Sequence, residues 1–418
     1  MRMLRSNIVK FLLSNYLVKG VAYLSQLLLI YFLAIEDVGR IRMSLSYYEL
    51  FNIICGLGLT TSLLKINSNK ALSDGEKGKN LFLSIGITTL FSLFAIIIVN
   101  LVAVLGLFSD IKEVNHLVQL LSLSLLINAV VNLLIIDFQV TNRYVELSKS
   151  QAISKLLVFA LFVPLVYLWG VNGYILSIYF GFILTLIILF LYGVSLSHSE
   201  VREGKFSIKD YTSFFAENFH ISFYALLSNT FGVLNKYIGL YIIGYMGVDQ
   251  KEFGMYSIAL TFLVLLEIIT YTLQQYFVPK FSTQSDNNDK WKVFFRKIEK
   301  KSQIFQLLVF IVTNILCYVV ISQFYIEYES VAYYFYVISL SWLISTLYTM
   351  KGPGLISLGR TKYNFYSSVV ALPFVVLVSF LLVTHYGVWG VAMSKVAQSV
   401  ISMITATYFF KLTMNSMK

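Results

Sequence analysis

The sequence predicts an all-α polytopic membrane protein of twelve transmembrane helices in two pseudo-symmetric six-helix lobes. Three observations carry this prediction. The chain of 418 residues is 58% apolar and only 13% charged, whereas soluble domains are about 25% charged. Apolar runs such as 82–105 are nearly continuous, which is typical of spanning helices and not of the alternating, roughly ten-residue strands of a barrel. An internal repeat divides the chain into two similar halves.

The first predicted helix covers 11–34. Arg2, Arg5 and Lys10 precede it, as basic residues precede the apolar segment of a signal peptide. The run of about 24 residues is long enough to cross about 30 Å of hydrocarbon, and no small-residue cleavage site follows it. We therefore expect a retained transmembrane helix.

Hydropathy over a window of about 19 residues predicts eleven further spans. The twelve cover 11–34, 43–64, 81–105, 116–136, 153–169, 172–194, 219–243, 254–276, 304–324, 331–350, 365–385 and 388–410. Because the number is even, both ends of the chain should lie on the same side of the membrane.

Lys and Arg predict the orientation. Of 32 such residues, 25 fall in segments on the side of the termini and 4 on the other side, namely Arg40, Arg42, Lys112 and Lys251. Positive residues mark cytoplasmic segments, so we expect both termini in the cytoplasm. The bias also accounts for the net charge of +11, and no nucleic-acid partner is implied. The basic stretch 290–301 should lie at the headgroups of membrane lipids.

Residues that could support catalysis or bind a metal are sparse. Cys55 and Cys317 fall inside apolar runs, where packing explains them better than a disulfide, redox chemistry or a metal. The four histidines show no metal or catalytic spacing. A membrane glycan polymerase or glycosyltransferase would need a large outer loop, but the predicted outer segments have about ten residues or fewer. We therefore expect no enzyme activity, no metal and no cofactor.

The internal repeat is visible in short motifs. Arg143 stands 27 residues before Gly170-Val171-Asn172-Gly173, and Arg360 stands 27 residues before Gly387-Val388-Trp389-Gly390, at an offset of 217. Asp37-Val38-Gly39 matches Glu252-Phe253-Gly254 at an offset of 215. These matches predict lobes over 1–210 and 211–418 in the same orientation, an arrangement typical of transporters with the substrate path between the repeats. The glycine motifs themselves indicate tight helical hairpins rather than a phosphate site.

Three cations lie in the interior of the predicted spans: Lys19, Lys236 and Lys395. Lys155, at the very start of the span 153–169, is counted with the inner segment before it. Intramembrane charges are costly and normally face a cavity or a partner. Lys19 and Lys236 differ by 217, the offset of the repeat, so they should occupy equivalent helices. Lys395 could equally extend its ammonium to the outer interface. Because an ammonium is a compact point charge suited to phosphate, these lysines favour an anionic substrate.

Two acids, Glu49 and Glu267, also lie in the spans. Either they neutralise Lys19 and Lys236 as buried ion pairs, or substrate binding releases them for a coupling proton or sodium ion. Uncharged polar residues could line the path or tie helices together. They are Asn15, Gln26, Asn52, Asn128, Asn132, Asn229, Asn235, Gln274, Gln275 and Gln398. Asn235, beside Lys236, is the one we expect at the substrate.

Several segments resemble a known family. They are 32–39 leading to Gly56-Leu57-Gly58, then Gly254-Met255-Tyr256 ending at Pro279, Gly359-Arg360-Thr361-Lys362, and Gly387-Val388-Trp389-Gly390. Together they resemble the polysaccharide transporter family, which includes the Wzx-type O-antigen and capsule flippases of the multidrug/oligosaccharidyl-lipid/polysaccharide (MOP) exporter superfamily. The resemblance covers essentially the whole chain. The lipid II flippase branch is expected to have fourteen spans, for which this chain lacks room.

The resemblance implies a two-lobed, MATE-like helical flippase in the bacterial cytoplasmic (inner) membrane. Its substrate would be an undecaprenyl-diphosphate-linked oligosaccharide for lipopolysaccharide O-antigen or capsule, moved from the cytoplasmic to the periplasmic leaflet by alternating access. The diphosphate would meet Lys19 and Lys236, and a polysaccharide polymerase complex is an implied partner. The alternative is a cation-coupled multidrug exporter of the same superfamily, which would be expected to place acids rather than lysines in its core.

Overall fold

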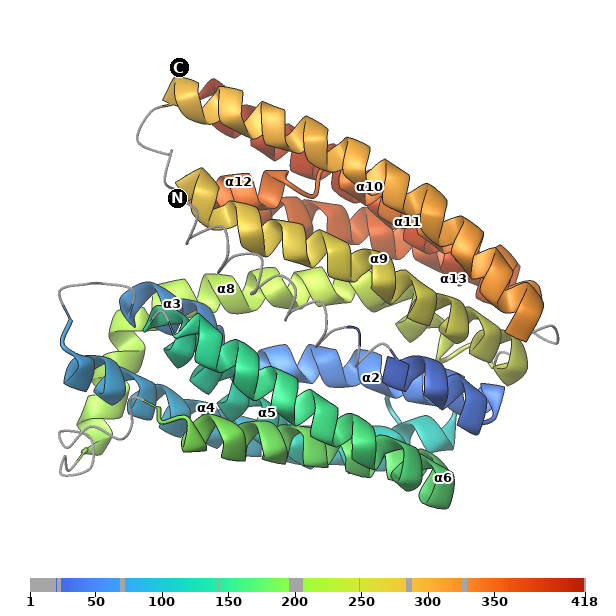
Figure 1. Cartoon of the computed structure of the whole chain (residues 1–418), viewed down its shortest axis with the longest axis horizontal. Coiled ribbons are helices and arrows are strands. Elements are labelled where there is room, and N and C mark those ends of the chain that lie inside the picture. The colour runs from blue at the N-terminus through green and yellow to red at the C-terminus, as the bar shows by residue number, and fades with distance from the viewer. Residues whose placement is uncertain are drawn as a thin grey trace. The chain divides into compact units, whose positions relative to one another are not determined.

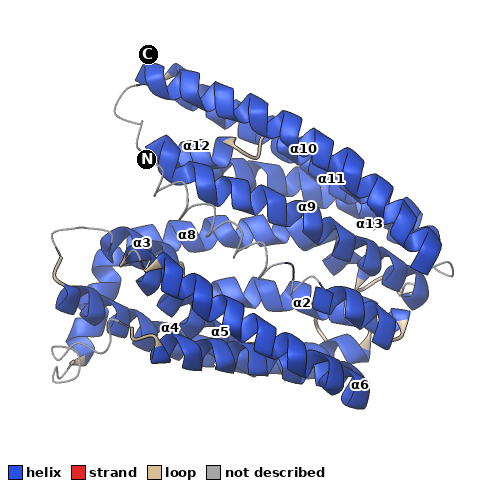
Figure 2. Ribbon diagram, viewed as in Figure 1, coloured by secondary structure: helices blue, strands red, loops and turns tan. Residues whose placement is uncertain are grey.

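The computed structural model describes residues 20, 24–67, 72–141, 143–194, 206–247, 249–282, 288–324 and 329–416. Within these ranges all regular structure is helical, as the sequence predicts (Figure 2). The helices are α2 (Ile35–Gly56), α3 (Leu59–Asn67), α4 (Asp74–Val104), α5 (Lys112–Val140), α6 (Tyr144–Leu191), α8 (Ile208–Ile243), α9 (Gln250–Ser282), α10 (Asn288–Phe324), α11 (Glu329–Thr346), α12 (Lys351–Ser357) and α13 (Lys362–Asn415) (Figure 1).

Most helices in this part of the chain, although not α8, have the length and hydropathy of membrane-spanning segments. Seven helical segments are long and apolar enough to cross a membrane, and α2 with α3 makes an eighth, bent by 46°. Two of the seven, α6 and α13, fold back on themselves and each contain two predicted spans. The polytopic helical prediction is therefore confirmed. A count of twelve spans is compatible with these helices but is not fixed by them.

The reversal of α6 occurs at Gly170, which adopts φ 54° and ψ −128°. Only glycine adopts this conformation readily. Gly173 then lies against the carbonyl of Leu165, where a side chain would overlap the backbone, and a Cβ on Gly181 would lie 3.5 Å from Val158. The two arms of α6 are therefore antiparallel and in contact.

The reversal of α13 repeats this geometry. Gly387 has φ 55° and ψ −128°, and Gly390 lies against the carbonyl of Leu382. Farther along the arms, Ser367 Oγ donates to Thr405 Oγ1 at 3.0 Å. Each of these glycines and leucines lies 217 residues after its counterpart in α6. The predicted repeat of the two hairpins, and the hairpin interpretation of their glycines, are thus confirmed.

The start of α2 differs from the sequence prediction. Residues 35–42 were expected to form an outer loop, but α2 begins at Ile35. Glu36 and Asp37 occupy its first turn, where negative side chains interact favourably with the helix dipole. Charged residues in these turns are therefore compatible with a helix, and the expectation of a loop was wrong.

The described residues form two compact units. Unit 1 contains those before Ala34 together with Ser44–Thr230, and unit 2 contains Ala34–Met43 together with those from Phe231 onward. The first part of α8 thus belongs to unit 1. There a Cβ on Gly86 would lie 2.5 Å from the Tyr211 ring, and Phe214 joins the apolar cluster around Leu81 and Leu134. The lobe boundary between 210 and 211 remains a prediction.

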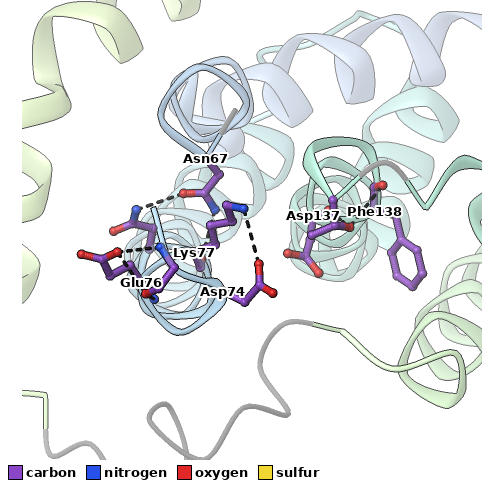
Figure 3. Close-up of polar contacts among 9 residues, drawn as sticks. Asn67, Asp74, Glu76, Lys77, Asp137 and Phe138 are labelled. Carbon is purple, nitrogen blue, oxygen red and sulfur yellow. Dashed lines mark hydrogen bonds and ion pairs between the residues drawn. The ribbon is translucent and has the colours of Figure 1, made fainter. Parts of the chain in front are cut away.

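In unit 1, polar contacts join the end of α3 to the start of α4 (Figure 3). Asn67 Nδ2 donates to the Lys77 carbonyl at 3.0 Å, and Asn80 Nδ2 donates to Asn67 Oδ1 at 2.9 Å. Ser73 and Glu76 form a reciprocal capping box, which satisfies two amide groups at the helix start. Lys77 Nζ lies 3.4 Å from Asp74 Oδ1.

In unit 2, an aromatic cluster holds the start of α10. Trp291 and Phe295 stack at 5.0 Å between ring centroids, with 11° between their planes. Both are buried with Phe281 of α9 and Phe410 of α13. Trp291 and Phe295 are four residues apart on α10 and therefore share one face of the helix. This face packs against α9 and α13, which fixes the start of α10.

The two cysteines, Cys55 and Cys317, are both buried and unbonded. This agrees with the packing role expected from the sequence.

Candidate substrate-binding site

Lys236 of α8 and Glu267 of α9 approach each other in unit 2. Lys236 Nζ lies 4.0 Å from Glu267 Oε2, and the two side chains are 32% and 27% exposed. One of the two predicted pairs of intramembrane charges is therefore present. Its separation is at the upper limit for an ion pair and both groups are partly accessible, so the attraction is weaker than in a buried, close pair.

Tyr237 supports the same ammonium group. Lys236 Nζ lies 4.8 Å from the centroid of the Tyr237 ring, within the range of a cation–π interaction. Tyr237 itself is buried. The cation of Lys236 is thus within interaction distance of a carboxylate on α9 and of an aromatic ring of its own helix.

Asn235 ties α8 to the first arm of α13. Its Nδ2 donates to the carbonyl of Ser368 at 3.1 Å. Its Oδ1 is buried and accepts no hydrogen bond from any described residue. The side chain predicted to meet substrate therefore has a structural contact on one side and an unused acceptor on the other.

Lys395 lies on the second arm of α13, which packs closely on α8. A Cβ on Gly239 would lie 2.8 Å from Ser394 Oγ, and Gly239 is one helical turn beyond Lys236. Lys395 follows Ser394 and is half-buried. The structure therefore brings Lys236, Asn235 and Lys395 onto two packed helices.

A polar network that the sequence analysis missed continues along α9 beyond Glu267. Thr270 Oγ1 accepts from Trp342 Nε1 at 2.9 Å and donates to Gln306 Oε1 at 3.3 Å. Gln306 is fully buried and donates to Ser302 Oγ at 2.6 Å. These bonds join α9, α10 and α11, and they restrict the rotation of α9 about its axis, which positions Glu267.

In unit 1, Lys19 lies outside the described residues, so its pairing with Glu49 stays a prediction. Glu49 is half-buried on α2. One turn away, Asn52 Oδ1 accepts from Asn128 Nδ2 of α5 at 3.0 Å. These two asparagines thus tie helices together, one of the two roles that the sequence left open.

Two further cations lie in the first turns of α2, where the sequence analysis expected a loop. Arg40 donates to Gln250 Oε1 through Nε at 3.0 Å and Nη2 at 2.5 Å, and through Nη1 to Asp37 at 3.1 Å. Arg42 is half-buried and interacts electrostatically with Tyr256. Val38 and Ile41 are three residues apart and both buried. This helical spacing of apolar residues was the signal that could have placed Arg40 and Arg42 in a helix.

The charged residues Lys155 and Asp137 also lie in helices of unit 1. The sequence analysis counted Lys155 with the inner segments and did not consider Asp137. Lys155 lies three turns after the start of α6 and is half-buried. Asp137 is buried near the end of α5, where Thr141 Oγ1 donates to its carbonyl at 2.7 Å (Figure 3). A count of charges per loop misses such residues because they stand at span ends.

Comparison with known families decides the classification. The sequence model of a family described as "Polysaccharide biosynthesis protein" matches residues 28–327. The chain belongs to this polysaccharide biosynthesis protein family. No curated protein matches the sequence.

This member of the polysaccharide biosynthesis protein family is similar in fold to solved transporter structures, one of which belongs to the MOP superfamily. An inward-facing multidrug resistance MATE transporter of that superfamily has a TM-score of 0.74 at 12% identity, with 97% of this chain and 95% of that chain covered. The lipid II flippase MurJ, in an inward closed conformation, has a TM-score of 0.75 at 15% identity, with 96% and 87% covered. The chain therefore has a transporter fold and is a multi-pass membrane protein.

Proposed function

We propose that this protein is a flippase for an undecaprenyl-diphosphate-linked oligosaccharide, an O-antigen or capsule repeat unit. It would move the unit from the cytoplasmic to the periplasmic leaflet of the bacterial inner membrane by alternating access, with both termini in the cytoplasm. The observation that supports this most directly is the loose Lys236–Glu267 pair, 4.0 Å apart and partly accessible.

The charge of the substrate explains how such a pair would work. A diphosphate carries more negative charge than one carboxylate, and phosphate is an anion to which lysine binds as a point charge. It would displace Glu267 from Lys236, with Lys395 as the second cation and Asn235 as a neighbouring polar contact. Lys19, one repeat offset before Lys236, would act in the same way.

Displacement of Glu267 would leave a carboxylate inside the membrane without its cation. Such a carboxylate is stabilised by taking up a proton or a sodium ion. Substrate binding and cation uptake at this pair would then be coupled, which gives the acid a role in driving transport. A polysaccharide polymerase complex, which would receive the translocated unit, is the proposed protein partner.

A cation-coupled multidrug exporter is the second candidate, because Glu267 and the aromatic Tyr237 would also suit a cationic substrate. The two functions make opposite demands on Lys236. An anion flippase needs its charge, whereas an exporter of cations would work as well or better without it.

The test uses bacteria that lack this protein. The leaflet that holds their lipid-linked oligosaccharides is determined after complementation with wild type, Lys236→Ala, Lys236→Arg or Glu267→Gln. Complete units should accumulate on the cytoplasmic face with Lys236→Ala, and Lys236→Arg should restore part of the transport. Lys251→Ala, an exposed change at the start of α9, is the matched control and should transport normally. Unchanged lipid-linked sugars in cells without the protein would contradict the proposal and favour the exporter.

A further inference from the structure

We propose that the outer face of α10 is a binding site for an anionic phospholipid of the membrane leaflet at the basic end of this helix. The site has two parts. The α10 basic face consists of Lys297, Lys300 and Lys301, and the α10 apolar face consists of Ile304, Leu308, Ile311 and Ile315. It lies apart from the Lys236–Glu267 pair, on the side of α10 that faces away from the protein.

The two parts form one continuous stripe. Along α10 the residues 297, 301, 304, 308, 311 and 315 recur every three or four positions, so they share one face of the helix. The side chains of Lys297, Lys300 and Lys301 are exposed, and Ile304, Leu308, Ile311 and Ile315 are 47–59% exposed. The opposite face is buried, with Trp291, Phe295, Ser302 and Gln306.

This helix is the least buried of the seven helical segments that are long and apolar enough to cross a membrane. In its most apolar 18-residue window only 17% of residues are buried, against 22–61% in the other six segments. The aromatic cluster of Trp291 and Phe295 fixes its start against unit 2, so the basic and apolar parts of the stripe stay aligned.

The charges at the start of α10 are not balanced by acids. Between 288 and 301 there are six Lys and Arg residues but only Asp289 and Glu299. Glu299 interacts electrostatically with Lys351 and Arg296. Among the described residues, none of the three lysines of the α10 basic face forms an ion pair. Their charge is thus available to an outside anion.

The start of α4, one repeat offset earlier, has a different arrangement. There Lys77 pairs with Asp74 at 3.4 Å (Figure 3) and Lys79 pairs with Asp210 at 3.6 Å. α4 also exposes apolar side chains, with Leu90 67% exposed. The two helices therefore offer similar apolar surfaces, but only α10 has unbalanced cations beside one.

The order and length of the stripe match one lipid molecule. Ile311 lies ten positions after Lys301, a rise of about 15 Å at 1.5 Å per residue, which is half of an approximately 30 Å hydrocarbon core. A phosphate bound to the α10 basic face therefore places one acyl chain along Ile304, Leu308 and Ile311. A zwitterionic lipid gains less from these lysines, because its own cation opposes them.

The experiment is photo-crosslinking of the full-length protein in vesicles of phosphatidylethanolamine with a minor share of phosphatidylglycerol. The photoreactive residue p-benzoylphenylalanine replaces Leu308, or Leu90 as the control position, and captured lipids are identified by mass spectrometry. At position 308 we expect phosphatidylglycerol about fivefold above its share, the factor that one lysine near an anionic surface supplies. At position 90 capture should follow the lipid composition.

Charge variants separate binding from folding. Lys297→Gln with Lys300→Gln and Lys301→Gln should abolish the enrichment, whereas arginine at the same three positions should keep it. Lys79→Gln is the matched control and should leave it unchanged. Capture at 308 in proportion to composition in the wild type would overturn the proposal, as would equal enrichment at 90 or enrichment that survives the triple glutamine variant. If the glutamine variant fails to fold, loss of wild-type enrichment at high salt gives the same test.

Discussion

Gly39 and Gly254, which the internal repeat places in equivalent motifs, contact each other in unit 2. A Cβ on Gly39 would lie 3.3 Å from the Gly254 Cα, and a Cβ on Gly254 would overlap the carbonyl of Ile35. The starts of α2 and α9 therefore cross with their backbones in contact, a crossing that small residues allow. Two hydrogen bonds from Arg40 to Gln250 join the two helices at the same crossing.

This crossing predicts unequal effects for two identical substitutions. Gly254→Ala should lower stability by about 1–3 kcal/mol, because its methyl group meets backbone that has no room to move. Gly39→Ala should cost less, since its nearest neighbour is the edge of the Phe253 ring at 3.0 Å. Thermal unfolding of the purified protein in detergent measures both. Gly232→Ala on α8, where a Cβ meets nothing within 4 Å, is the control; a similar loss there would contradict the explanation.

The two hairpin glycines should respond alike. Gly170 and Gly387 share φ 54–55° and ψ −128°, a conformation that costs a residue with a side chain about 1–3 kcal/mol. Gly170→Ala and Gly387→Ala should therefore reduce the unfolding temperature by similar amounts, and the double variant should lose the sum because the sites lie in different units. A large effect at only one of them would show that the two turns are not equivalent.

The Lys236–Glu267 pair should matter more for transport than for stability. Because both groups are partly exposed and 4.0 Å apart, their interaction should contribute at most about 1 kcal/mol. A double-mutant cycle with Lys236→Ala and Glu267→Ala, measured by unfolding, should give a coupling energy in this range. The same variants should strongly impair translocation of lipid-linked oligosaccharide. Strong mutual stabilisation with normal transport would instead indicate a purely structural pair.

Asp210 should give a pH-dependent contribution to stability. It lies in the exposed first turn of α8, before the predicted span, and hydrogen bonds from Ser207 N and Oγ at 2.8 and 2.9 Å, helped by Lys79, lower its pKa below the usual 3.8. A lowered pKa in the folded state stabilises the protein above the unfolded-state pKa and is lost as pH falls through the folded one. The stability difference between wild type and Asp210→Asn should therefore be present at neutral pH and disappear in acid.

Two variants test the cause of this shift. Ser207→Ala removes the hydrogen bond from Ser207 Oγ but keeps the larger contribution, the bond from Ser207 N, so it should narrow the stability difference only in part. Lys79→Gln, which removes a charge 3.6 Å away, should also narrow it. If the stability difference between wild type and Asp210→Asn persists unchanged at pH values below the folded-state pKa, the Asp210 carboxylate is not its source.

The features that the sequence predicted correctly depend on local signals. Apolar runs require helices in a membrane whatever their neighbours, and Gly170 and Gly387 specify hairpins by themselves. The features that it missed depend on partners distant in sequence. Arg40 was assigned to a loop because a count of charges gives no weight to Gln250, and the bonds of Thr270 with Trp342 and Gln306 involve uncharged groups with no distinctive spacing. Lys236 was found because a charge in an apolar run is visible without any partner.

The division of α8 between the units has a consequence for the independence of the two repeats. Tyr211 and Phe214 complete the apolar packing of unit 1, yet they follow the loop that joins the two repeats. The start of α2, from the first repeat, packs within unit 2. A single repeat made as a separate polypeptide would thus lack part of its own interior and expose part of another's. The two repeats are therefore no longer self-contained, because each compact unit includes residues from both of them.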